Sequence, residues 1–144
     1  MKYILNIFLI LIIIACNQDK AEVGNLEREV FAVHDEVMPK MDKLLELKEA
    51  VSLDISKADS LLNIKSNLDL EKRKVEGLAI SESLEDADRN MMDWMHNYKS
   101  DSLKTLSAVE AIKYLKAEKI KISAVRDKML ESITKAEKFT GVNP

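Results

Sequence analysis

Residues 80–98 have the sequence ISESLEDADRNMMDWMHNY, and this stretch decides the fold. Its apolar residues recur at alternating steps of four and three: Ile80, Leu84, Ala87, Met91, Trp94 and Tyr98. This heptad spacing places them on one seam of a helix, as in helices that pack nearly antiparallel or as a coiled coil. The stretch therefore predicts a long helix, over about residues 67–99, that packs against other helices.

Two similar patterns flank this helix. On its amino-terminal side, steps of three and four join Leu26, Val30, Val33, Val37, Met41, Leu44, Leu47, Val51, Ile55, Ala58 and Leu62. On its carboxyl-terminal side the apolar positions are Leu115, Ile122, Val125, Met129, Ile133 and Ala136. We expect helices over about 23–64 and 103–140, and short connections make such helices antiparallel neighbours. The sequence predicts an all-α protein whose residues 23–141 form an elongated, coiled-coil-like antiparallel three-helix bundle.

Helix-terminal signals support these boundaries. Ser66 with Asp69 fits a variant of the helix-start signature, and Ser107 with Glu110 fits the capping box. Gly141 stands where a helix stop is expected. The polar residues 99–102 predict a turn between the second and third helices.

Pro39 falls inside the first apolar stripe. Proline removes a helical hydrogen bond and clashes with the carbonyl group four residues earlier, so we expect a kink near residues 35–39. A new helix starting at Pro39 is the alternative, and it is weaker because Met38 is a poor cap.

The first fifteen residues have the pattern of a secretory signal peptide. Lys2 is followed by an apolar run over residues 3–15, broken only by Asn6, and then by Cys16 and a polar stretch. A spanning helix needs about 20 apolar residues, so this run is short for a membrane span. We expect residues 1–15 to be the signal peptide and residues 16–22 to be the lipidated cysteine and a polar tether.

Residues 13–16, Ile-Ile-Ala-Cys, resemble the bacterial lipobox. In that class of signals, diacylglycerol is joined to the cysteine and the chain is cut before it. Cys16 is the only cysteine in the chain, so it forms no internal disulfide. The alternative is an uncleaved membrane anchor with an incidental cysteine.

Composition and motifs exclude several classes of protein. The net charge is −3 and the charges are interspersed, whereas a nucleic-acid surface would show a basic stripe. The basic cluster at residues 72–74 lies between Glu71 and Glu76, as on a solvated helix face. The sequence has no glycine-rich phosphate loop, no Cys-x-x-Cys and no His-Glu-x-x-His motif. We expect no enzymatic activity, no cofactor and no nucleic-acid partner.

One group of residues is a candidate site, which we call the Met/His patch. Its members are His34, Met38, Met41, Met91, Met92, Met95 and His96. If the first turn is centred near residue 66, the two segments that carry them lie level with each other in the membrane-proximal half. Two interpretations remain open: methionines filling the gap left by a proline kink, with or without a partner surface, and a copper site of thioether and imidazole ligands.

A resemblance covers nearly the whole chain. Residues 34–41, HDEVMPKM, and residues 87–96, ADRNMMDWMH, resemble small lipoproteins of Gram-negative bacteria that are often labelled "viral A-type inclusion protein". The spacing of Ser132, Ile133 and Ala136 is also similar. The resemblance implies an envelope location and a helical form, and it carries over no catalytic residue.

The sequence therefore predicts a membrane-anchored envelope lipoprotein that acts as a helical interaction or spacer module. Its expected partners are the membrane, through Cys16, and an unidentified protein. Asn17 differs from the aspartate that marks inner-membrane retention in enteric bacteria, which favours the outer membrane. A copper-type metal-binding lipoprotein that uses the Met/His patch is the alternative, and an envelope chaperone is a third.

Overall fold

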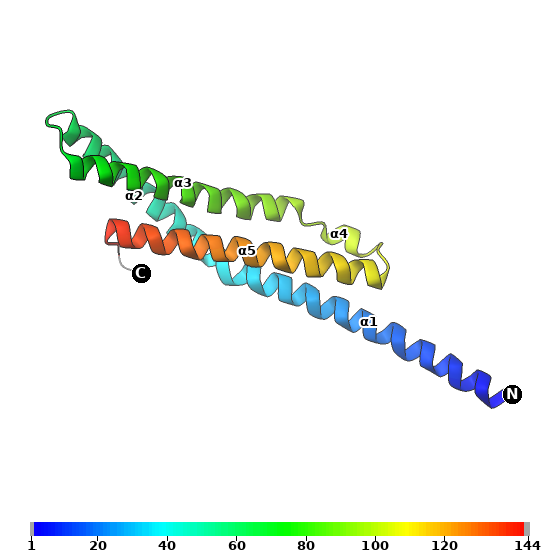
Figure 1. Ribbon diagram of the computed structural model, residues 1–144. Coiled ribbons are helices and arrows are strands. Elements are labelled where there is room, and N and C mark those ends of the chain that lie inside the picture. Colours follow the sequence, from blue (N-terminus) through cyan, green and yellow to red (C-terminus); the bar gives the residue numbers. More distant parts are fainter. Residues whose placement is uncertain (1, 143–144) are drawn as a thin grey trace.

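The computed structural model describes the backbone of residues 2–142 and the side chains of residues 19–142. Over this range all regular structure is helical, which confirms the predicted all-α class (Figure 1). The elements are α1 (Lys2–Val37), the 3₁₀ turn η1 (Met38–Lys40), α2 (Met41–Leu62), α3 (Leu68–Asn97), α4 (Ser100–Leu103) and α5 (Ala108–Thr140).

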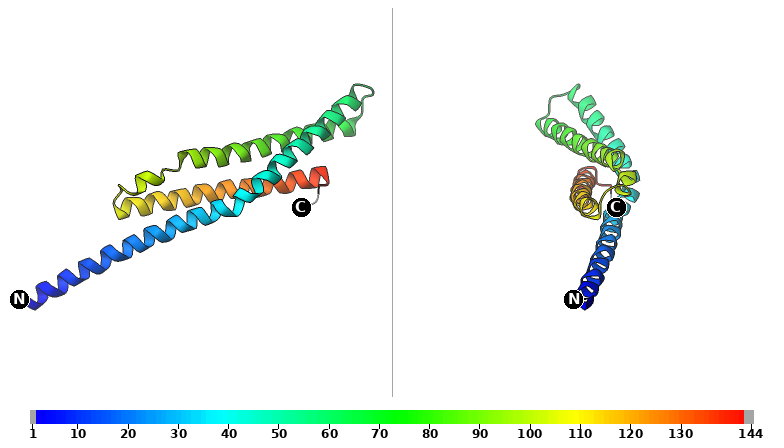
Figure 2. Two further views of the ribbon diagram at one scale, coloured as in Figure 1. Left: turned by 180° about the vertical axis from the view of Figure 1, so that it is seen from behind. Right: turned by 90° about the vertical axis from the view of Figure 1, so that its right-hand side faces the viewer.

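The helices form an elongated bundle in which α1 and α2 make one bent rod (Figure 2). Before the bend, α1 packs chiefly against α5, and after it α2 packs chiefly against α3. Helices α3 and α5 also pack against each other. The α2–α3 turn lies at one end of the bundle, and the α4–α5 turn lies at the other end, beside Lys20 and Val23 in the middle of α1 (Figure 1).

The three predicted apolar stripes form the core. Every residue of the three stripes is buried or half-buried. The largest fully buried side chains include Leu44, Leu47, Leu84, Met91, Leu115, Ile122 and Met129. Since periodicity alone placed these positions inward, the amphipathic pattern accounts for how each helix faces the bundle.

The predicted kink is also present. Pro39 lies in η1, where the α-helical hydrogen-bonding pattern gives way to a 3₁₀ turn, and α2 leaves this turn in a new direction (Figure 2). Val37 before the turn is fully buried and Met41 after it is half-buried, so the apolar stripe continues through the bend.

The helix ends agree with the sequence at two of the three predicted signals. Ser107 and Glu110 form a complete capping box, and Gly141 ends α5 in the left-handed conformation with φ of 70°. At α3 the prediction was wrong by one residue, because Asn67 and not Ser66 is the cap. Asn67 is extended, and its Oδ1 accepts hydrogen bonds from the backbone N–H groups of Asp69 and Leu70.

Three other boundaries differ from the expected ones. The helix already includes residues 17–22, where we expected a tether, and Glu22 makes a 3.0 Å ion pair with Lys116 of α5. The predicted turn at 99–102 is partly helical, as α4, and the expected helix over 103–140 begins as α5 only at Ala108. The predicted signal peptide and Cys16 fall within residues 1–18, which lie outside the range of described side chains, so these assignments stay predictions.

Candidate functional site

The structure divides the Met/His patch. Met91 is fully buried, whereas its neighbour Met92 is 54% exposed and His96 is also exposed. Three more methionines are half-buried against the core: Met38, Met41 and Met95. Consecutive residues on a helix point about 100° apart, so Met91 and Met92 face different surroundings. The seven residues therefore do not converge on one position.

His34 instead joins a group of rings that we call the aromatic cluster. Its members are Phe31, His34, Trp94, Tyr98 and Tyr114, which come from α1, the carboxyl-terminal end of α3 and α5. The centroid of the Trp94 ring lies 5.7 Å from that of His34 and 5.2 Å from that of Tyr98. Tyr98 in turn lies within ring-contact distance of Phe31 and Tyr114. The cluster ties three helices together just before the bend in the first rod.

A buried carboxylate lies against this cluster. Glu118 of α5 is 4% exposed, and its Oε2 accepts a 3.0 Å hydrogen bond from the indole Nε1 of Trp94. Its Oε1 accepts a 2.8 Å hydrogen bond from the ammonium group of Lys121, and this contact raises the pKa of Lys121. A buried carboxylate is costly unless it is paired, and here each oxygen has a donor. The arrangement fixes how α3 and α5 meet.

The two tyrosine hydroxyl groups of the cluster differ. The hydroxyl oxygen of Tyr114 accepts a 2.8 Å hydrogen bond from the backbone N–H of Lys99. The hydroxyl group of Tyr98 is buried and has no hydrogen-bond partner within residues 19–142. Burial, with a smaller contribution from the nearby Glu27 carboxylate, raises the pKa of Tyr98 to about 12. Tyr98 therefore stays neutral, as suits a ring held in a packed interface.

A groove of about 540 Å³ runs beside the cluster, between α3 and α5. Its lining is mostly polar or charged and consists of Asn90, Asp93, Trp94, Asn97, Lys99, Tyr114, Glu118, Lys121 and Val125. Neither histidine of the chain lines it, and both oxygens of Glu118 are already engaged. The groove offers donors and acceptors to a polar surface but presents no paired nucleophile and base.

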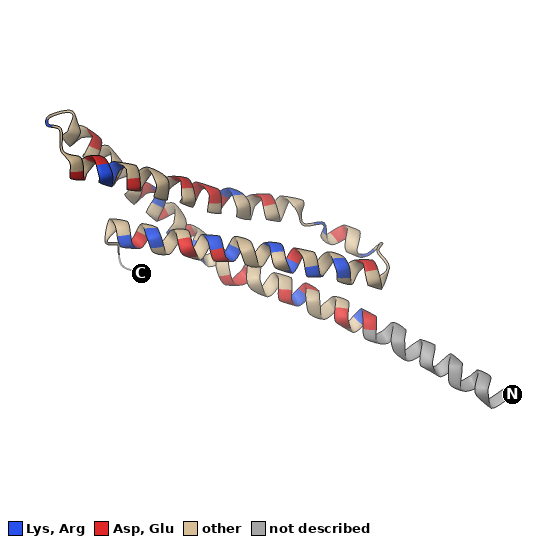
Figure 3. Ribbon diagram, viewed as in Figure 1, with Lys and Arg blue, Asp and Glu red and all other residues tan. Residues whose placement is uncertain are grey.

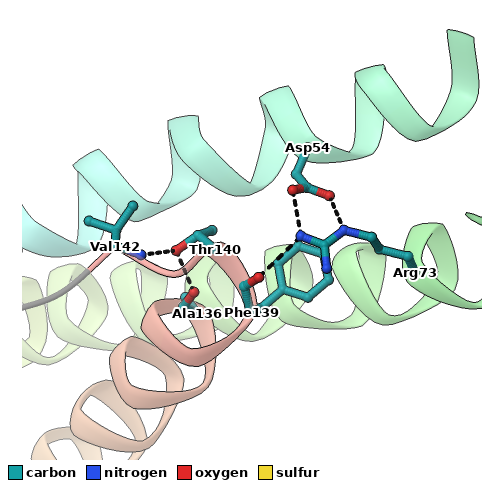
Figure 4. A network of polar contacts seen from close by, with 6 residues as sticks. All are labelled: Asp54, Arg73, Ala136, Phe139, Thr140 and Val142. Atoms are coloured by element: carbon teal, nitrogen blue, oxygen red, sulfur yellow. Dashed lines mark hydrogen bonds and ion pairs between the residues drawn. The ribbon is translucent and has the colours of Figure 1, made fainter.

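A second polar cluster joins the far end of α5 to the α2–α3 pair (Figure 4). Arg73 donates two hydrogen bonds to the carboxylate of Asp54, at 2.7 and 2.6 Å, and a third to the backbone oxygen of Phe139 at 3.2 Å. Its guanidinium carbon lies 4.5 Å from the centroid of the Phe139 ring. The hydrogen bonds from Arg73 hold the pKa of Asp54 below its usual value. This cluster fastens the end of α5 to both other helices.

Charged residues also line the helix seams (Figure 3). Glu22, Glu29 and Glu36 of α1 follow one another at seven-residue intervals. They pair with Lys116, Lys119 and Arg126 of α5 at 3.0, 2.8 and 3.7 Å. Such pairs beside a heptad seam favour one alignment of neighbouring helices over others.

In the part of the chain whose side chains are described, no group of three or more His, Cys, Asp and Glu residues is placed to hold a metal ion. Over the same part, no helix combines the length and the apolar character needed to cross a membrane. No family model, no curated protein and no solved structure matches the chain.

Three residues of the site were missed by the sequence analysis: Phe31, Tyr114 and Glu118. Glu118 had a signal, because it falls at a core position between Leu115 and Ile122 in the third stripe. A carboxylate at a core position of a predicted helix needs a buried donor, and the single tryptophan of the chain was the obvious candidate. Phe31 directly follows the core residue Val30, and Tyr114 directly precedes the core residue Leu115. Neither lies on an apolar stripe, so the sequence pattern did not single them out.

Proposed function

We propose that the protein is a membrane-anchored lipoprotein of the cell envelope, and that its helical domain acts as a spacer and interaction module. The lipobox-like residues that end at Cys16 support the anchor. The resemblance to small envelope lipoproteins of Gram-negative bacteria supports the same envelope location, and Asn17 favours the outer membrane. The domain follows the anchor directly, since α1 already pairs with α5 at Glu22.

The observation that carries the spacer role is the elongated bundle. Helix α5 has 33 residues, which at 1.5 Å per residue corresponds to about 50 Å. The end near Lys20 lies next to the proposed anchor in sequence, and the α2–α3 turn lies at the opposite end (Figure 1). A rod of this kind holds the α2–α3 turn away from a membrane to which its amino-terminal end is tied.

The far end offers apolar side chains to a protein partner. Leu61, Ile64 and Leu68 beside the α2–α3 turn are 50, 83 and 63% exposed. Exposed large apolar side chains that gather in one place are a common feature of interaction surfaces. They support the interaction part of the proposal.

The Met/His patch fits a structural role better than a metal site. Met91 packs in the core, His34 packs on Trp94, and His96 is exposed. Bonds to a metal ion require ligand atoms to gather within about 2.3 Å of one point. No observation on the described side chains favours the copper alternative.

Metabolic labelling with a fatty acid tests the proposal. Wild-type protein should carry the label and sediment with membranes. Cys16→Ser should lose the label and accumulate as the longer precursor, because the thiol is the proposed acceptor. Gln18→Ser is the matched control, since it changes a neighbouring polar residue and should behave as wild type. A Cys16→Ser protein that still carries the label would overturn the proposed anchor.

A further inference from the structure

The end of the bundle nearest the proposed anchor carries apolar side chains that the core does not bury. Val109, in the first turn of α5, is 72% exposed, and Leu106, just before it, is 37% exposed. A groove of about 210 Å³ lies at this end, and five of its six lining residues are apolar: Val23, Leu103, Leu106, Ala108 and Ala111. The sixth is Lys20. This surface joins α1 to the α4–α5 turn.

The chain length fixes how far this surface lies from Cys16. Lys20 is four residues after Cys16, and an extended chain covers at most about 3.6 Å per residue. The Cα atom of Cys16 therefore lies within roughly 14 Å of that of Lys20 in any conformation. Since Lys20 lines the groove, a lipid on Cys16 would bring the bilayer surface within reach of Leu106 and Val109.

The lysines around these two side chains suit a lipid interface, and the acidic Glu110 beside Val109 is engaged by Ser107 in the helix cap. Lys104 and Lys113 flank them in sequence and are exposed, and Lys104 has only an exposed ion pair with Asp101, at 3.2 Å. Lysine can lay its apolar stem along a membrane interface while its ammonium group stays among the headgroups. Apolar side chains flanked by lysines are typical of segments that lie in the interface.

We propose that the α4–α5 turn is a second membrane contact, in which Leu106 and Val109 enter the interfacial region of the bilayer beside the acyl anchor. The inference rests on the proposed lipidation of Cys16 and extends it. A single flexible attachment would let the rod pivot, whereas two contacts on neighbouring elements fix its orientation. The α2–α3 turn is then held at a defined height above the membrane.

Depth-dependent fluorescence quenching tests this contact on the mature lipidated protein, purified from membranes and reconstituted in phosphatidylcholine–phosphatidylglycerol vesicles. Leu106→Cys and Val109→Cys each introduce one thiol for a polarity-sensitive fluorophore, because the thiol of Cys16 is occupied by lipid. Two matched controls place the probe at other exposed apolar positions, Ile64→Cys at the far end and Ile120→Cys further along α5. Unchanged melting of each labelled variant establishes that it is folded.

We expect the probes at positions 106 and 109 to shift to shorter wavelength and to lose several-fold more intensity to nitroxide-labelled lipids than those at 64 and 120. Equal quenching at all four positions, or none at 106 and 109, would overturn the inference. A wavelength shift without quenching by the labelled lipids would mean that protein covers the turn, and would also overturn it.

Flotation of the same samples separates this inference from the anchor. Protein that floats with the vesicles but shows no quenching at 106 and 109 leaves the anchor in place and removes the second contact. Protein that neither carries lipid nor floats contradicts the anchor, and the second contact fails with it.

Discussion

The middle of the bundle and the tip of the α2–α3 hairpin contain similar apolar residues but bury them to very different extents. In the middle of the bundle, around Leu84 and Trp94, three helical segments pack together, and Leu84 is fully buried. Helix α5 ends level with Arg73 and Gly77, as the contacts of Phe139 with both residues show. Among the residues that the structure describes, the helices that continue beyond that level are α2 and α3 (Figure 1), and Leu61 there is 50% exposed.

The difference shows that burial here depends on how many helices surround a position. The tip has one well-buried apolar residue, Ala58, and relies on polar contacts instead. Lys74 forms an ion pair with Asp59 across the hairpin, and Asn67 caps α3. Segments with few buried apolar contacts open at lower free energy than the core, so the tip should open locally before the middle unfolds.

The largest expected effect separates the two regions directly. Leu84→Ala should lower the free energy of unfolding by about 2 to 4 kcal/mol, because it removes a fully enclosed side chain and leaves a cavity. Leu61→Ala makes the same chemical change at the tip and should cost less than about 0.5 kcal/mol. Urea denaturation followed by circular dichroism measures both. Equal losses in the free energy of unfolding would contradict this comparison. They would mean that Leu61 is buried by other residues, or that Leu84 is not tightly packed.

The next effect concerns the buried carboxylate of Glu118, which lies against the aromatic cluster. Glu118→Ala should cost about 2 kcal/mol, because the indole N–H of Trp94 is left buried without an acceptor. Trp94 is the only tryptophan, so its emission should also shift as water enters. Glu118→Gln is the matched control, since its amide oxygen can still accept that hydrogen bond. If Glu118→Ala and Glu118→Gln are equally stable, the hydrogen bond from Trp94 does not hold α3 to α5.

Two Gly→Ala substitutions, which should change the stability in opposite directions, define the boundary between the regions more closely. A Cβ atom at Gly77 would lie 2.8 Å from Cγ1 of Ile55 and 3.1 Å from Cζ of Phe139, where α2, α3 and α5 meet. Gly77→Ala should destabilise by about 1 kcal/mol, the overpacking cost outweighing the gain in helix propensity. Gly24→Ala meets nothing within 4 Å and should stabilise by about 0.5 to 1 kcal/mol. Thermal melting measures both, and a stabilising Gly77→Ala would show that the helices do not meet closely there.

The last effect depends on pH and belongs to the polar cluster of Asp54, Arg73 and Phe139 at the end of α5. Arg73→Gln should cost about 1 kcal/mol near neutral pH, since it removes a partly exposed ion pair and the contact with the Phe139 ring. The folded pKa of Asp54 lies below its unfolded value, so its contribution is present above the unfolded pKa and is lost as pH falls through the folded one. The stability difference between wild type and Arg73→Gln should therefore shrink at acid pH. A difference that is constant with pH would assign the loss to the contacts of Arg73 with Phe139, through its ring and its backbone oxygen.

The sequence was sufficient for the helices and their buried faces because periodicity is local information. Each of the three stripes, such as the one from Ile80 to Tyr98, could be recognised without knowing its partners. Local signals failed where two neighbours compete for one role, as with Ser66 and Asn67 at the start of α3. There the extended backbone of Asn67 decides which side chain reaches the free N–H groups.

The candidate site was less predictable because its contacts join different helices. Aligning the first two predicted helices about a turn near residue 66 placed His34 near the end of α3. The ring of His34 does pack on Trp94. The same reasoning treated Met91 and Met92 alike, although one faces the core and the other faces away. The hydrogen bond between Trp94 and Glu118 spans 24 residues and depends on the rotation of α5, which the turn alone does not specify.

Which end of the bundle faces the membrane depends on Cys16, and the mass of the mature amino terminus tests this most directly. Protein purified from membranes should begin at Cys16, and its first proteolytic peptide should carry the added mass of a diacylglyceryl group with or without a further acyl chain. A chain that begins at Met1 with an unmodified Cys16 would contradict the anchor, and with it the placement of the α4–α5 turn at the membrane.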